Sequence, residues 1–137
     1  MPFYTRLFVK TSLVYAVLAE GLLALTDLAS LLRWNNFSPY QTALHLFLVG
    51  WVLQLIIGIA YWMFPKYTRE RPRGYDGLMA LSYGALNLGL VLRLAVEPVP
   101  TFWVAPWART VFAISSVAQW LGLLAFVANM SLRIKVK

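Results

Sequence analysis

The chain has one histidine, His45, and no cysteine among its 137 residues. Zinc and copper centres need several nitrogen or sulfur ligands, which a single imidazole does not supply. Haem iron needs only one protein ligand, and a neutral imidazole commonly provides it. His45 begins the apolar run HLFLVGWVLQLIIGIAYWMFP at 45–65. Two interpretations follow: a half-hydrated imidazole at a membrane interface, or the ligand of a haem.

Few other ionisable side chains fall inside apolar segments, where they are costly and mark functional sites. Glu20 and Asp27 are seven residues apart, so they share one face of a helix. Arg93 and Arg109 are expected at the depth of Asp27, and either is a candidate partner for this carboxylate. Alternatively, the two arginines bind a carboxylate ligand through their planar guanidinium groups.

Glu20 lies near the middle of its apolar segment, whereas the basic residues lie near the ends of theirs or outside them. We expect this carboxyl group to be protonated or to form a hydrogen bond with Asn87 or Gln119. A role in proton relay, or in lining a transport path, is the alternative for an ionisable group at this depth.

Composition assigns these residues to a membrane protein. Hydrophobic residues make up 61% of the chain and charged residues 12%, whereas soluble domains have about 25% charged residues. Mean hydropathy is +0.68. Four apolar stretches, at about 8–32, 42–64, 77–96 and 109–130, are each long enough to cross a hydrocarbon core of about 30 Å. We predict one all-α domain over 1–137, an integral membrane four-helix bundle in a lipid bilayer.

The net charge of +7 reflects the orientation of the spans rather than nucleic-acid binding. Basic residues concentrate in the cytoplasmic segments of membrane proteins. In this chain they concentrate near both termini and in the second connection, which joins the second and third apolar stretches. These residues are Arg6, Lys10, Lys66, Arg69, Arg71, Arg73, Arg133, Lys135 and Lys137. Both termini are therefore predicted to be cytoplasmic, in a prokaryotic inner membrane.

The third apolar stretch contains two pairs of small residues at a spacing of four. They are Ala80 with Gly84 and Ala85 with Gly89. Such pairs let helix backbones approach closely in lipid. We predict a close helix contact here, either within the chain or with another subunit.

The second apolar stretch resembles the second helix of subunit I of the haem-copper oxidases. In that family a haem-ligating histidine begins the helix, a glycine falls in its last third, and an aromatic-x-x-proline motif ends it. His45, Gly58 and the segment from Trp62 to Pro65 stand in these places. The first stretch resembles the family's first helix through Tyr15, Gly21 and the sequence SLLR at 30–33.

The resemblance implies that His45 ligates a haem b, with Arg33 beside it. The predicted depth of His45 would place the haem propionates near Arg33, Arg93 or Arg109, where charge pairing can offset burial. The family's subunit has twelve helices in three arcs of four, and several histidines. This chain looks like one such arc. The resemblance therefore implies self-association, as a trimer by analogy or as a dimer, and a chain that is not a complete oxygen reductase by itself.

All four methionines, Met1, Met63, Met79 and Met130, are predicted on the cytoplasmic side, so none in the same subunit can be a second axial ligand. We expect a small membrane haem b protein that carries electrons or binds a gas. One alternative is a cofactor-free accessory or assembly subunit of a respiratory complex. Another is a small transporter or channel in which Glu20 lines the path.

Overall fold

The computed structural model describes residues 1–34 and 36–134, which form helices joined by short connections. Three helices are long and regular: α1 (Phe3–Leu31), α4 (Asp76–Val96) and α5 (Pro106–Ser131). The remaining span is continuous over three elements: α2 (Tyr40–His45), the π-helical η1 (Leu46–Leu53) and α3 (Gln54–Met63). A single 3₁₀ turn, η2 (Pro100–Phe102), lies between α4 and α5.

All four spans are long and apolar enough to cross a membrane. This finding confirms the predicted all-α membrane architecture, and the described ranges contain no strand. The first span begins at Phe3 rather than at 8, and the last begins at Pro106 rather than at 109. Proline suits the first position of a helix, because its missing N–H would have no helical partner there. Lys135 and Lys137, used to predict the orientation, lie outside the described residues.

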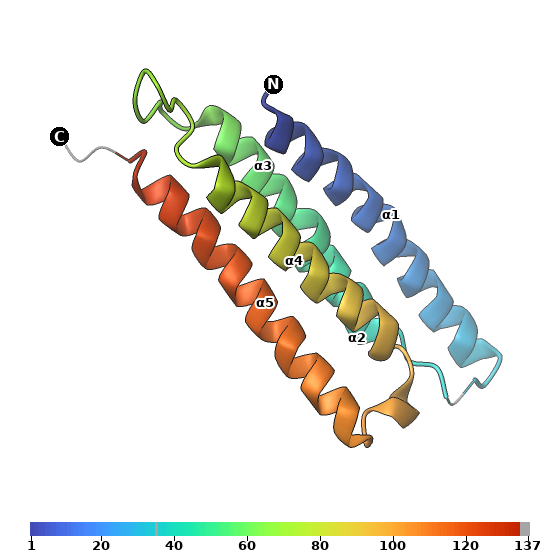
Figure 1. Cartoon of the computed structure of the whole chain (residues 1–137). Helices are drawn as coiled ribbons and strands as arrows, with labels where there is room; N and C mark the ends of the chain where they lie inside the picture. The colour runs from blue at the N-terminus through green and yellow to red at the C-terminus, as the bar shows by residue number, and fades with distance from the viewer. Residues whose placement is uncertain (35, 135–137) are drawn as a thin grey trace.

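The helices lie side by side, and the start of α1 and the end of α5 are at the same end of the array (Figure 1). We call this the terminal end, and we call the opposite end, where α2 begins and α4 stops, the histidine end. α4 packs along α5, and α1 packs along α2, η1 and α3. α1 and α5 therefore form opposite flanks of the array (Figure 1).

Two glycines let α4 and α5 approach closely. A side chain at Gly89 would meet the backbone carbonyl of Ser115, and one at Gly122 would lie 3.0 Å from backbone atoms of α4. The Ser115 hydroxyl donates to the Gly89 carbonyl at 2.7 Å. The close contact predicted for Gly89 is therefore confirmed, and it lies within the chain. Ala80 and Gly84 are exposed instead.

Amide and hydroxyl side chains join the helices in the middle of the array. Asn87 of α4 accepts a hydrogen bond from the Tyr15 hydroxyl of α1 at 2.8 Å. Its side chain also faces the buried amide of Gln54, with both N···O distances at 3.4 Å. Interhelical hydrogen bonds in lipid are worth about 0.6–2 kcal/mol each. This network therefore fixes the positions of α1, α3 and α4 relative to one another.

Two side chains hold the second connection at the terminal end: Asn129 in the last turn of α5 and Arg133 just after this helix. Arg133 is buried and donates from Nε to the Pro65 carbonyl and from Nη1 to the Tyr61 carbonyl, each at 2.9 Å. These bonds satisfy carbonyl groups left free at the end of α3. Asn129 accepts a hydrogen bond from the Tyr75 N–H at 2.8 Å, just before α4 begins.

We expect Gly122→Ala to lower the free energy of unfolding by about 1–3 kcal/mol, because the added methyl group overpacks the contact with α4. Gly84→Ala is the matched control, since no other helix or side chain in the described part of the chain lies within 4 Å of the added methyl group. That change should be neutral or slightly stabilising in a helix. Thermal unfolding in detergent, followed by tryptophan fluorescence, measures both. Equal midpoints for the two variants would contradict the close packing.

Candidate functional site

His45 is the last residue of α2, and the π-helical segment η1 begins at the next residue. π-Helical turns are rare and occur frequently at functional sites. Ala43 and Leu46, on either side of His45, are fully buried, whereas the His45 side chain is 34% exposed. The imidazole therefore lies at the edge of the core and is accessible from outside.

The Nδ1 atom of His45 lies 2.9 Å from the backbone carbonyl oxygen of Gln41 and 3.1 Å from Oε2 of Glu97. Both neighbours are acceptors, so Nδ1 must carry the hydrogen. This hydrogen is aligned with the Gln41 carbonyl, and no aligned donor reaches Glu97 Oε2 within the described residues. In the neutral ring, Nε2 consequently carries the lone pair.

Glu97 connects His45 to the other helices at this end. Its side chain is 5% exposed, and Oε1 accepts a hydrogen bond from Nη1 of Arg93 at 3.0 Å. Nη2 of Arg93 donates to the Ser116 hydroxyl of α5 at 2.9 Å. The Trp103 indole N–H donates to the Glu97 backbone carbonyl at 3.0 Å. We call His45, Glu97, Arg93 and Ser116 the histidine cluster.

Burial alone would raise the pKa of the Glu97 carboxyl group, but His45 and Arg93 lower this pKa below its ordinary value. Glu97 is therefore charged at neutral pH, and a buried charge needs a cationic partner. Arg93 provides a permanent positive charge. His45 adds a second one only when its ring is protonated.

A cavity of about 460 Å³ adjoins the histidine cluster. This volume is within the range of about 300–1,000 Å³ that is typical of ligand sites. Its walls combine aliphatic side chains with imidazole, guanidinium and carboxylate groups; the lining residues are Gln41, Leu44, His45, Leu48, Val49, Arg93 and Glu97. The cavity suits a largely apolar ligand that has a few polar groups.

The other site residues predicted at this end do not join the cluster. Arg33 and Arg109 are both exposed, and Arg33 has the positive φ angle of 56° just after α1. The expected pairing of Asp27 with Arg93 or Arg109 is wrong within one chain. Arg93 pairs with Glu97, and the exposed Asp27 and Arg109 belong to opposite flanks of the array (Figure 1).

The expected hydrogen bond between Glu20 and Asn87 or Gln119 is also wrong. Glu20 is exposed on α1. Asn87 binds Tyr15 instead, and the Gln119 amide donates to the Ser115 hydroxyl at 3.2 Å. Within a single chain, Glu20 therefore does not line an interior path for protons or solutes.

Sequence reasoning missed Glu97, which it assigned to the connection after the third span. The sequence feature that points to Glu97 is its position four residues after Arg93. Residues at this spacing are neighbours on a helix surface and often form ion pairs. Only Asp27 was considered as the partner of Arg93, because it falls inside a predicted span and Glu97 does not.

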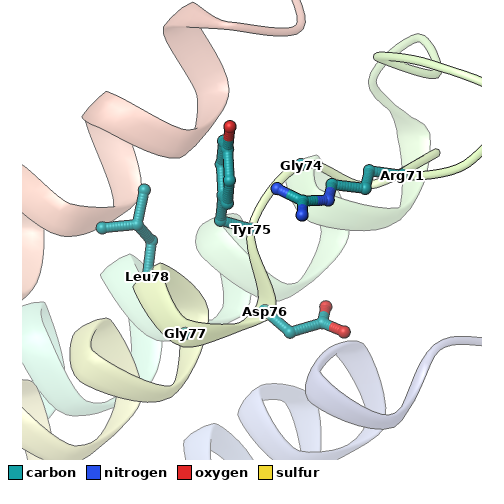
Figure 2. Close-up of a pocket in the computed structure, with 6 residues that line it drawn as sticks. All are labelled: Arg71, Gly74, Tyr75, Asp76, Gly77 and Leu78. Atoms are coloured by element: carbon teal, nitrogen blue, oxygen red, sulfur yellow. The ribbon is translucent and has the colours of Figure 1, made fainter.

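A larger hollow, of about 640 Å³, surrounds the first turn of α4 at the terminal end (Figure 2). The Arg71 guanidinium carbon lies 4.9 Å from the centre of the Tyr75 ring. The Asp76 carboxylate accepts a hydrogen bond from the Tyr61 hydroxyl at 3.0 Å. Because its lining includes no imidazole, this hollow is a weaker candidate for a metal-binding site than the cavity beside His45.

Comparison with protein-family models, with curated proteins and with solved structures gives no match for this chain. None of these comparisons bears on the resemblance to haem-copper oxidase subunit I. A function for the chain therefore has to be inferred from the geometry of the histidine cluster.

We expect Glu97→Gln to lower the free energy of unfolding at neutral pH by about 1–3 kcal/mol, because Arg93 loses its anionic partner. The folded-state pKa of Glu97 is lowered, so the stabilisation is present above the unfolded-state pKa of about 4.3 and is lost as the pH falls through the folded-state pKa. The difference from wild type should therefore shrink below about pH 4. Thermal unfolding in detergent at several pH values measures it.

Glu70→Gln is the matched control, because Glu70 is exposed in the second connection. This variant should follow the wild type at every pH. A stability difference for Glu97→Gln that stays constant down to about pH 3 would contradict the charged pairing of Glu97.

Proposed function

We propose that this chain is a membrane protein that binds haem b through His45, either to carry electrons or to bind a gas. The environment of the imidazole supports the proposal most directly. Its Nδ1 faces the Gln41 carbonyl and the Glu97 carboxylate, which leaves Nε2 with a lone pair. Histidines that ligate metals almost always donate their other ring N–H to a carboxylate, a backbone carbonyl or water.

Haem fits this set of donor atoms better than other metal centres do. One imidazole is a sufficient protein ligand for haem iron. The described residues contain no group of three or more His, Cys, Asp or Glu side chains that could hold a bare metal ion. Leu44, Leu48 and Val49 give the adjoining cavity an aliphatic wall, as is usual in cofactor sites.

In this proposal the residues of the cluster hold and orient the ligand. Gln41 and Glu97 fix the tautomer and the ring orientation of His45, and a carboxylate partner makes imidazole a stronger donor. Arg93 keeps Glu97 charged and in place. Arg33, exposed at the same end, adds a guanidinium group that suits a carboxylate of the haem propionates. Bound haem would supply a one-electron redox centre or a site for a gas.

The methionines do not offer a second axial ligand. Met63 is about 27 Å along the span from His45. Met79 and Met130 are buried in the hydrophobic core near the terminal end, and Met1 precedes α1. Among these side chains, His45 alone would therefore hold the haem, and the bound group would supply a redox centre or a site for a gas.

The purified protein, expressed with ample haem, should show a Soret band and a reducible α band. His45→Ala should abolish both bands while circular dichroism shows that the helices remain. In His45→Gly, added imidazole should restore haem binding, because only the ligand has been removed. Met63→Leu is the matched control and should leave the spectrum unchanged.

Haem retained at full stoichiometry in His45→Ala would overturn the assignment of the ligand. A folded wild type without haem would overturn the proposed function. It would favour a cofactor-free accessory subunit, in which the histidine cluster only connects α2, α4 and α5. Arg33→Ala should weaken haem binding or shift the redox potential without abolishing the bands.

We also propose that the terminal end faces the cytoplasm, because basic residues concentrate there. Cysteines introduced at Tyr67 and Thr101 test this orientation, since the chain has no cysteine of its own. In intact cells, a membrane-impermeant thiol reagent should label Thr101→Cys and spare Tyr67→Cys. The opposite pattern would invert the orientation.

A further inference from the structure

Both flanks of the array carry an exposed polar stripe. On α1, Glu20, Ala24 and Asp27 are all exposed, and their spacing of four and three residues aligns them along one face. On α5, Arg109, Ala113 and Ser116 are exposed at the same spacing. The two ion pairs within the described residues use neither Glu20, Asp27 nor Arg109.

The α1 stripe is costly if it faces lipid. Glu20 lies about 25 Å from the start of α1 and about 16 Å from its end, so it is near the middle of the span. Lipid tails offer no hydrogen-bond donors at that depth. Ionisable residues within membrane spans almost always face protein or a water-filled cavity. A protein partner with donors at two depths, seven residues apart, would satisfy both carboxylates of the stripe.

We propose that this partner is α5 of a second copy of the chain. Asp27 lies four residues before the end of α1, and Arg109 lies three residues after the start of α5. Both are thus about 5 Å from the histidine end. α1 and α5 run in opposite directions, so Asp27 faces Arg109 in the contact, and Glu20 faces Ser116 seven residues deeper.

The surfaces around these groups are complementary in shape as well as in charge. Ala24 and Ala113 lie between the two polar pairs, and small residues allow close helix approach in lipid. An apolar groove of about 380 Å³ adjoins Ala113 and includes Val117 and Leu121. Exposed aliphatic side chains of α1, such as Val17, are available to fill this groove.

The contact would connect α1 of one copy to the histidine cluster of the next. The Ser116 hydroxyl oxygen already accepts a hydrogen bond from Arg93. Its own hydrogen is free to donate to the Glu20 carboxylate of the neighbouring copy. Each copy has one α1 flank and one α5 flank, so the contact repeated around a symmetry axis uses both flanks and closes a ring.

Cysteine cross-linking in membranes tests the proposal, because no cysteine is present in the natural chain. Ala24→Cys and Ala113→Cys are made singly in copies that carry different tags. On mild oxidation, membranes that contain both variants should yield a disulfide-linked pair with both tags, and neither variant alone should cross-link. Ala95→Cys, exposed near the histidine end of α4, is the matched control and should not cross-link to Ala113→Cys.

No cross-link between the two variants would overturn the proposal. Self-cross-linking of Ala24→Cys, or equal cross-linking by the Ala95→Cys control, would also do so. The charges are tested in the same assay. Asp27→Arg should reduce the cross-linked fraction severalfold, and Arg109→Asp in the other copy should restore it. An unchanged fraction in Asp27→Arg would overturn the proposed charge pair.

Discussion

The carboxylate of Glu97 holds the histidine end together. Removing such a group from water costs several kcal/mol, so the surrounding residues must supply positive charge and hydrogen-bond donors. Arg93 meets this need and is held in turn by Ser116 of α5, while His45 approaches from α2. The only imidazole in the chain thus lies beside a buried carboxylate, Glu97, that needs positive charge and hydrogen-bond donors around it. Without Glu97, nothing in the cluster would join α2 to α4 and α5.

Similar polar contacts hold the array at two further depths. Asn87 joins three helices near the middle, and Arg133 and Asn129 hold the second connection at the terminal end. Lipid tails are as apolar as leucine, so burying leucine against leucine does little to select one helix neighbour over another. Polar contacts and close-packed glycines supply that selection. Among the described residues, the carboxylates of Glu20 and Asp27 on α1 have no such contact.

Hydropathy made the four spans predictable, because crossing a bilayer requires about 20 apolar residues whatever lies beside them. The depth of His45 and of Arg93 was predictable for the same reason. The neighbours of each side chain at a given depth were not predictable, because depth does not determine on which flank of the array a side chain lies. Asp27 and Arg109 share a depth but belong to opposite flanks (Figure 1). Glu97 was missed because it lies one residue beyond α4, where apolar periodicity has ended.

The π-helical segment η1 determines how His45 is oriented around the helix axis relative to Gln54. His45 and Gln54 are nine residues apart, which on a regular α-helix is two and a half turns and would point them in opposite directions. Both nevertheless reach the third span, His45 at Glu97 and Gln54 at Asn87. The wider turns of η1 remove the extra half-turn, because the same residues then make fewer turns. A one-residue length change within 46–53 would therefore act as a rotation, moving the imidazole around the helix axis while hardly changing its depth in the membrane.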